Sequence, residues 1–373
     1  MIRHLNDALA LIEGRKDFVV KRDPAYIAID YAVAFPDTFE DARRHELRGL
    51  KFYPDTGEIM ARPLHKFFNV GEKEHTQSHL LDFDADHIIM DKLDGSMIHP
   101  ALLRDGSVRF MTRMGVTDVA RKAERHLSDE LRTMLADLLA SGVTPVFEFT
   151  APDNRIVVRY AESGLTLLAV RDTLTGEYEK RAGVESVASA LGLPVVRTWE
   201  RPASGAELIE TVRAIKGAEG VVICFASGLW VKIKGEEYAL MHKAKDSITR
   251  EKNVLATILD GLADDLRPLL SPEDRAQLDA FEAKLTAAML VCAERVDATV
   301  AQGAHLDQKA FAVDLMGAMD PWYRGLAFSV RAGKATALEA VRAYLRKHCG
   351  SQADVDSVRH IVGARWDELA GVE

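Results

Sequence analysis

The spacing of apolar positions changes near residue 245. Before it, apolar runs of strand length alternate with turn residues, whereas after it apolar positions recur every three or four residues. Short bounded runs are typical of strands, and the longer spacing is typical of amphipathic helices. The pattern predicts an α+β domain of antiparallel sheets flanked by helices over residues 1–245, followed by an all-α domain over residues 246–373.

Turn signals place hairpins and a helix in the first part. Asp-Gly at 105–106 is a strong hairpin signal, because both central residues of a type I′ turn need positive φ, and Thr-Gly at 175–176 and Ser-Gly at 227–228 are weaker. A two-residue loop at 227–228 would pair Lys234 with Val221 and Lys232 with Ile223. The runs at 144–150 and 155–160 also predict strands. Ser128 is an expected N-cap for a helix over 128–140.

The second part carries helix signals only. Ser271-Pro272 has the composition of a helix start, and Thr336 with Glu339 forms a capping box. One apolar stripe follows Ser271 at spacings of three or four: Leu278, Phe281, Leu285, Met289, Cys292, Val296 and Val300.

Composition narrows the class of protein. The 373 residues are 47% hydrophobic and 28% charged, which is ordinary for a globular protein and excludes extended disorder. We expect no membrane span, because no apolar run approaches about 20 residues, and no signal peptide. Three distant cysteines predict neither disulfides nor a zinc ribbon and fit a reducing cytoplasm. A net charge of −9 argues against a protein that coats DNA.

The charge is unevenly distributed along the helical part. Residues 260–320 contain 12 acidic and 5 basic residues, whereas residues 321–365 contain 8 basic and 3 acidic ones, together with Trp322, Tyr323 and Tyr344. Basic side chains among aromatics suit a nucleic-acid backbone with stacked bases. A solvated helical surface with some aromatics in the core explains the same pattern, and this feature alone favours that explanation.

Four strings contain residues that could do chemistry. In IIMDKLDGSM a strand delivers Lys92 to a turn at Asp94-Gly95, which could also be a surface turn. In EGVVICFASGLWVKIKG, Glu219 and two lysines converge on one side of a hairpin. Two close ammonium groups are costly unless an anion such as phosphate lies between them. The strand VFEFTAP carries Glu148, a residue usually solvated in such a place. The strings ELRGLKF and RPLHKFFN offer ordinary basic residues, Arg48, Arg62 and Lys66.

In this order the strings resemble the motifs of the covalent nucleotidyltransferases, the polynucleotide ligases and mRNA-capping enzymes. The strings RGLKF, RPLHKFFN, KLDGS, FEFTAPDNRIV, VRDTLTGEY, EGVV, KIKGEEY and TILDGLADDL look more specifically like the bacteriophage RNA ligase 1 family, which repairs tRNA. This resemblance covers residues 31–270. DNA ligases and capping enzymes usually continue with a β-barrel, which the helical pattern disfavours.

The resemblance implies roles for individual residues. Lys92 would be the nucleophile that carries AMP, and the ATP-binding positions would be Tyr31, Arg48, Lys66, Lys92, Glu148, Lys232 and Lys234. Glu148 would bind the ribose, and Glu219 would hold waters of the catalytic metal, Mg²⁺ with Mn²⁺ as an alternative. Tyr238 matches a position needed for ligation, and Asp264 with Asp265 matches a metal-binding pair that could instead be a solvated helix end. Arg113 departs from the family's usual lysine.

The implied protein is an ATP-dependent RNA ligase. It would join 5′-phosphate and 3′-hydroxyl RNA ends through lysyl-AMP and RNA-adenylate intermediates. Its helical domain would dock structured RNA, expected to be cleaved tRNA, in the cytoplasm (of the host cell, if phage-encoded), with no membrane and no obligate protein partner. The rival interpretations are a DNA ligase, a capping enzyme, or a nucleotide-dependent RNA-binding module without turnover. The full set of lysines and acids disfavours the last, because a binding module needs no nucleophile.

Overall fold

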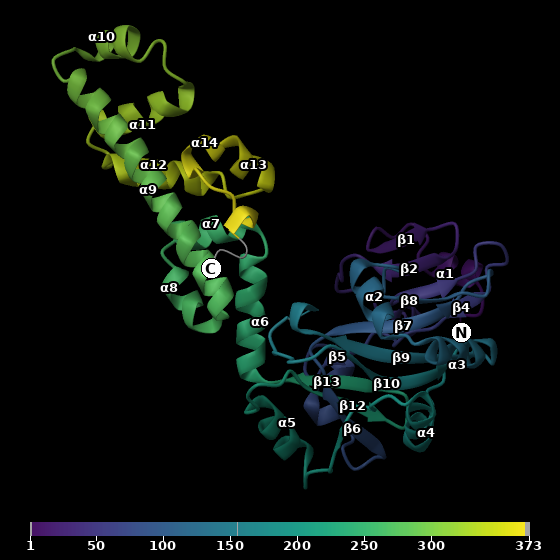
Figure 1. Ribbon diagram of the computed structural model, residues 1–373. Coiled ribbons are helices and arrows are strands. Elements are labelled where there is room, and N and C mark those ends of the chain that lie inside the picture. The colour runs from purple at the N-terminus through teal and green to yellow at the C-terminus, as the bar shows by residue number, and fades with distance from the viewer. Residues whose placement is uncertain (1, 155, 370–373) are drawn as a thin grey trace. The chain divides into compact units, whose positions relative to one another are not determined.

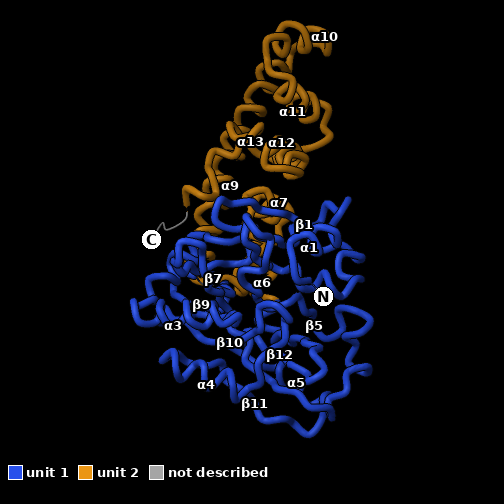
Figure 2. The backbone as a smooth tube through the Cα atoms, turned by 90° about the vertical axis from the view of Figure 1, so that its right-hand side faces the viewer, with its two compact units in different colours: residues 1–239 blue, residues 240–373 orange. Residues whose placement is uncertain are grey.

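The computed structural model describes residues 2–154 and 156–369. The chain divides into two compact units, Met1–Ala239 and Leu240–Glu373, shown in different colours in Figure 2. The division lies inside helix α6 (Glu236–Ile248), slightly before the position at which the apolar spacing changes. Among the described residues, no helix has the length and apolar character needed to cross a bilayer.

The first unit is built on three sheets (Figure 1). Every strand pair is antiparallel except β13 with β5. In spatial order the first sheet is β1 (Phe18–Arg22), β2 (Ile27–Tyr31), β3 (Leu50–Phe52) and β4 (Ile59–Ala61); the second is β10 (Gly164–Asp172), β9 (Val143–Thr150), β7 (Ser96–Leu102) and β8 (Val108–Met111); the third is β11 (Thr198–Trp199), β6 (His87–Lys92), β12 (Gly220–Phe225), β13 (Trp230–Lys234) and β5 (Phe68–Asn69).

Helices accompany these sheets, so the predicted α+β class is confirmed. They are α1 (Leu5–Leu11), α2 (Asp118–Ala123), α3 (Asp129–Ala140), α4 (Arg181–Leu191) and α5 (Gly205–Arg213). The helix predicted at 128–140 is present as α3, and the Ser128 hydroxyl accepts the Leu131 N–H at 3.1 Å. Apolar side chains of α3 and α4 share one buried cluster with those of β9 and β10.

One strand prediction in this unit is wrong, and one hairpin prediction is met by a single bridge only. The run at 155–160 is predicted to be a strand, but its described residues, 156–160, form none and bend at 156–158. Val157 and Val158 donate their N–H groups to a carboxylate instead of a neighbouring strand. The Thr-Gly turn at 175–176 closes only an isolated bridge between Arg171 and Tyr178. The hairpin at 105–106 is confirmed by the pairing of β7 with β8.

The second unit is helical throughout the part that the structure describes. After α6 come α7 (Glu251–Leu259), α8 (Ala263–Leu266), α9 (Pro272–Gln302), α10 (Gln308–Ala310), α11 (Pro321–Arg331), α12 (Ala337–Lys347), α13 (Gln352–Ser357) and α14 (Arg359–Val362). The long α9 (Figure 1) carries the predicted stripe. The members of the stripe are buried or half-buried. The predicted cap at Ser271 and the capping box at Thr336 are both present.

The three aromatic residues singled out in the basic stretch at 321–365 pack in or against the core of this unit. Tyr323 is buried, and Trp322 and Tyr344 pack against the same cluster. Arg342 donates to the Leu259 carbonyl at 2.6 Å, and Arg346 pairs with Asp260 at 2.6 Å, both at the end of α7. The explanation by core aromatics therefore holds for all three rings, and these two arginines are engaged within the unit.

Candidate functional site

The turn after Lys92 is held from three sides. Lys92 is the last residue of β6, and Asp94 is 1% exposed. One Asp94 oxygen, Oδ1, accepts the Tyr238 hydroxyl at 2.6 Å, and Oδ2 accepts the N–H groups of Val157 and Val158 at 2.7 Å. A Cβ at Gly95 would lie 2.4 Å from the Phe149 carbonyl oxygen, so only glycine lets the turn pack this closely on β9. The turn is thus a buried anchor for Lys92 and not a solvated loop.

Glu219 lies between two lysines. Its Oε2 is 2.8 Å from Lys92 Nζ, and its Oε1 is 3.1 Å from Lys234 Nζ. The carboxylate is 4% exposed, while the Lys92 and Lys234 side chains are 23% and 27% exposed, so both ion pairs are partly shielded from water. The predicted convergence of Glu219 with a lysine of the hairpin is therefore present, and Lys92 joins it.

The register of this hairpin differs from the prediction by one residue. Phe225 and Leu229 flank a three-residue loop with Gly228 at φ +88°, so Lys232 faces Val222 and Lys234 faces Gly220. A glycine in the left-handed region suits a three-residue loop better than the two-residue loop assumed from the sequence. Gly220 also pairs with Lys92, so this glycine, which has no side chain, separates the two lysines that Glu219 bridges.

Gly220 has a backbone that other residues rarely adopt. Its φ is +146°, and an added Cβ would lie 2.0 Å from the Ile233 carbonyl oxygen. The strand therefore begins with an irregular residue directly after Glu219. The acid consequently reaches the lysines although strict alternation along a strand would not put it on their side.

Lys232 lies beside an aromatic ring and near other lysines. Its Nζ is 5.8 Å from the centroid of the Phe67 ring. Burial, followed by repulsion from Lys66, Lys92 and Lys234, lowers the pKa of Lys232 to about 7. Because the charged form of Lys232 is disfavoured here, an anion bound beside it would stabilise that form strongly.

Glu148 is buried, contrary to the usual place of a glutamate in a strand. It lies in β9 opposite Met97 and is 8% exposed. Burial raises the pKa of Glu148 to about 8, although Lys92 and Arg48 act in the opposite direction. The side chain is therefore protonated at neutral pH and can donate a hydrogen bond, for example to a sugar hydroxyl.

Tyr31, Arg48 and Lys66 belong to the same group of interacting side chains as Glu148 and Lys232. Lys66 Nζ lies 5.5 Å from the Tyr31 ring centroid, and the Arg113 guanidinium lies 4.7 Å from it. Burial raises the pKa of Tyr31, but Lys66, Arg113 and Arg48 outweigh it and lower the pKa overall. Burial lowers the pKa of Arg48, and Arg113 adds to this.

These charges interact as one group in the first unit. Arg48 and Lys92 both act on Glu148, and Lys66 and Lys92 both act on Lys232. All seven residues expected to bind ATP therefore lie within one electrostatic cluster, together with Glu219 and Tyr238. Sequence reasoning missed the aromatic residues Phe67 and Phe68 that surround its cations, although both stand beside Lys66 in the string that was singled out.

A cavity of about 800 Å³ opens on the same face of β6 as Lys92. Its wall includes Met90, two residues before Lys92, together with Leu168, Ala169 and Trp230. Neither Lys92 nor Glu148 lines it. Charged residues also line the cavity, among them Glu46 and Arg171, so its wall is mixed in character.

The structure puts the predicted metal residues in different units. Glu219 is in the cluster described above, whereas Asp264 and Asp265 are in α8 of the second unit, where Asp264 pairs with Arg267. In the part of the chain that the structure describes, no three His, Cys, Asp or Glu side chains form a group that could hold a metal ion. One acid is nevertheless compatible with Mg²⁺, which usually keeps several waters and takes other ligands from phosphates.

Comparison with known proteins defines the family. A model of the RNA ligase family matches residues 46–248, more than half of the chain. The chain therefore belongs to the RNA ligase family, and the predicted family is confirmed.

Individual relatives match parts of the chain. A putative RNA ligase from Thermovibrio ammonificans is 34% identical over 252 residues, 64% of each chain. RNA ligase 1 of bacteriophage TS2126 is 31% identical over 184 residues, 47% of this chain and 46% of that one. The matches thus span less than two thirds of either relative. Among solved structures, an archaeal ATP-dependent RNA ligase aligns over 96% of this chain and 95% of its own, with 17% identity and a TM-score of 0.49.

Proposed function

We propose that this protein is an ATP-dependent RNA ligase that joins a 5′-phosphate to a 3′-hydroxyl RNA end. The observation that carries the proposal is the cluster around Lys92 in a chain of the RNA ligase family. It combines one lysine anchored on a buried turn, two further lysines, a buried carboxylate between lysines and a protonated glutamate.

The proposed reaction has three steps. Lys92 Nζ attacks the α-phosphorus of ATP, so that a P–N bond forms and pyrophosphate leaves. The 5′-phosphate of RNA then attacks the adenylate, breaking the P–N bond and releasing the lysine. Finally the 3′-hydroxyl attacks the activated phosphate, and AMP leaves.

The cluster supplies what the first step needs. Lys232 and Lys234 would meet the negative charge that grows on the phosphate oxygens, where charge stabilisation is worth most. Arg48 and Lys66 would bind the rest of the triphosphate, with Tyr31 beside them. The protonated Glu148 would hold the ribose. The wider superfamily often stacks adenine on an aromatic residue of the strand that here is β10, where Leu168 and Val170 stand instead, so we propose that backbone contacts select adenine.

Magnesium would be the metal, with manganese as an alternative, and it would neutralise the phosphate oxygens when bound. Glu219 would hold its waters once ATP draws Lys92 and Lys234 toward phosphate. Tyr238 would act by fixing Asp94, to which it donates its hydroxyl hydrogen bond. Asp264 and Asp265 would form a separate metal site. We propose further that the second unit recognises structured RNA, such as cleaved tRNA, and that the protein works in the cytoplasm without an obligate protein partner.

Labelling with ATP tests the proposal. Wild-type protein with [α-³²P]ATP should become labelled, and Lys92→Ala should not. The same variant should still seal RNA that already carries a 5′-adenylate, because this substrate bypasses the first step. Labelling by GTP but not ATP would instead indicate a capping enzyme, and sealing of DNA ends only would indicate a DNA ligase. A label that survives in Lys92→Ala would disprove the assignment.

A further inference from the structure

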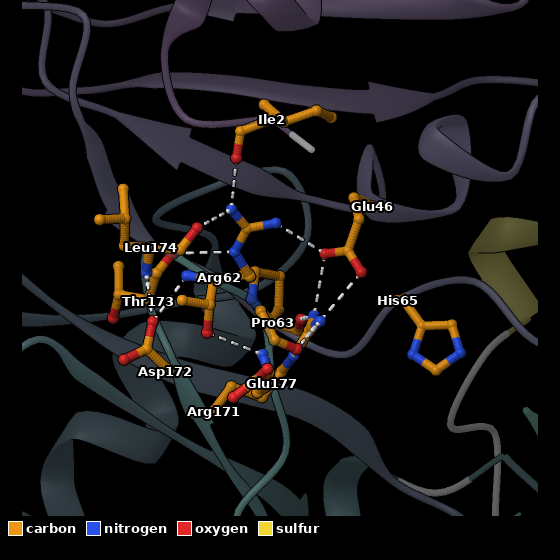
Figure 3. Close-up of polar contacts among 12 residues, drawn as sticks. Ile2, Glu46, Arg62, Pro63, His65, Arg171, Asp172, Thr173, Leu174 and Glu177 are labelled. Carbon is orange, nitrogen blue, oxygen red and sulfur yellow. Dashed lines mark hydrogen bonds and ion pairs between the residues drawn. The ribbon is translucent and has the colours of Figure 1, made fainter. Parts of the chain in front are cut away.

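Beside the cluster, two buried arginines and a glutamate that is 24% exposed form an ionic network (Figure 3). Arg62 Nη1 donates to Glu46 Oε2 at 2.9 Å, and Arg171 binds both oxygens of the same carboxylate, at 2.9 and 3.1 Å. Each arginine is 1% exposed. None of the three residues is among those expected to bind ATP.

The network is a strong internal constraint. Burial by itself would raise the pKa of Glu46, but Arg171 and Arg62 hold it at about 2. The carboxylate therefore stays charged at every pH at which the protein is expected to work. Removing one member leaves an uncompensated buried charge, which is costly. Such networks fix the groups around them more than they add stability.

The arginines bind backbone carbonyls that have no partner in a sheet or helix. Arg171 Nη1 donates to the Pro63 carbonyl at 2.6 Å (Figure 3). Its guanidinium stacks 4.3 Å from the centroid of the Tyr178 ring. Arg62 binds the carbonyls of Thr173 and Ile2 at 2.8 and 2.7 Å. Residues 62–67 form no strand or helix. Their path is therefore set by the buried side chains.

This irregular segment carries Lys66 and also contacts Arg48. The Lys66 N–H donates to the His45 carbonyl at 2.8 Å, next to Glu46. His65 is held by Tyr178, whose hydroxyl lies 2.7 Å from His65 Nδ1. Arg48 Nη1 lies 3.4 Å from the Leu64 carbonyl oxygen. Both cations therefore stand on segments, 45–48 and 62–66, that the network ties together.

We propose that Glu46 and Arg171 are positioning residues that aim Arg48 and Lys66 at the triphosphate of ATP. The inference rests on the proposed nucleotide site. The two cations need a fixed geometry, because a displacement of about 1 Å can cost on the order of a hundredfold in rate. No regular element provides this geometry for residues 62–67, and the network does.

Glu46→Gln tests the proposal, because it keeps the shape of the side chain and removes the charge that pairs with both arginines. In the full-length protein we expect the KM for ATP in adenylylation of Lys92 to rise at least about tenfold, with a smaller change in kcat. Glu251→Gln is the matched control, since Glu251 forms a comparable pair with Arg359 in the second unit. It should lower the unfolding temperature but leave the KM for ATP unchanged. Equal effects of both variants on KM would overturn the proposal.

A double-mutant cycle separates positioning from simple loss of fold. If Glu46 acts in part through Arg48, then Glu46→Gln combined with Arg48→Ala should raise the KM by less than the product of the two separate effects. Fully additive effects would contradict the proposal. Should Glu46→Gln not fold, Glu46→Asp keeps the charge and shortens the reach, and the same non-additivity is expected. Wild-type protein that forms no lysyl-AMP would instead refute the proposed function itself.

Discussion

Glu148 carries its proton in a place where the charged form is disfavoured. Its folded pKa is about 8, against an ordinary value of 4.5, because the carboxyl is buried. Between these values the unfolded chain releases a proton that the folded chain keeps. The stability contributed by this carboxyl is thus present below pH 4.5 and is lost as the pH rises through about 8.

Glu148→Gln should therefore stabilise the protein increasingly as the pH rises. Glutamine keeps the size and a hydrogen-bond donor but cannot ionise, so its advantage should be near zero at pH 4.5. It should grow toward a few kcal/mol at pH 8, since one pKa unit corresponds to about 1.4 kcal/mol. Urea unfolding of both proteins from pH 5 to 8 measures this. A constant difference across that range would show that Glu148 is ionised in the folded state.

Gly220 lets Glu219 reach the lysines, so Gly220→Ala should affect both fold and activity. A φ of +146° and a Cβ 2.0 Å from a carbonyl oxygen leave no room for a side chain. We expect a loss of about 1–3 kcal/mol in unfolding free energy and at least tenfold slower adenylylation. Gly164→Ala is the control, because a Cβ there meets nothing within 4 Å and φ is not positive. If Gly220→Ala adenylylates Lys92 at the normal rate, the position of Glu219 is not needed for the first step.

At the scale of elements, two arginines of α12 stabilise the unit to which this helix belongs. Arg342 and Arg346 contact the end of α7, where carbonyls lack helical partners and cations are favourable. Reversing both to glutamate should lower the unfolding temperature of the second unit by a few degrees. Lys347→Glu on the same helix should not, because Lys347 is exposed and forms no ion pair with any described residue. Thermal unfolding followed by circular dichroism distinguishes the two variants, and equal stability of both would contradict this role.

The same elements show how far sequence reasoning reaches. Local signals were sufficient for the caps at Ser128 and Ser271, because capping depends on residues a few positions apart. The predicted register of β12 and β13 is wrong by one residue, because the loop between them contains three residues and not the two that the Ser-Gly signal indicated. The described residues of the segment at 155–160 have the composition of a strand, but the carboxylate of Asp94, far away in sequence, takes two of its N–H groups.

In the site, too, the sequence was sufficient to predict some residues and not others. The order of strings identified Lys92, Glu148, Glu219 and the two lysines, because their chemistry needs particular residue types. Nothing local to Glu46 or Arg171 distinguishes them, since their roles arise from contacts across more than a hundred residues. Likewise Trp322 and Tyr344 resembled a binding surface, and only tertiary packing shows that they face a core.

On the scale of the whole molecule, the two units have separate cores. The apolar clusters of the first unit contain described residues up to 233, and those of the second unit begin at Ala244. The match to the RNA ligase family likewise ends at residue 248, with the end of α6. A chain ending at residue 250 keeps the whole cluster, including the contact of Tyr238 with Asp94.

We therefore expect residues 1–250 to form lysyl-AMP and to seal simple single strands, but to lose preference for a nicked tRNA stem-loop over an unstructured strand. In the full-length protein, Lys334→Glu and Lys347→Glu should weaken tRNA binding, because both lysines are exposed and unpaired among the described residues. For each lysine that binds a phosphate, its replacement should reduce the slope of log affinity against log salt by about one. Sealing of both substrates at several salt concentrations measures this. Equal losses on both substrates, or none on tRNA, would mean that the second unit supports the fold without selecting RNA.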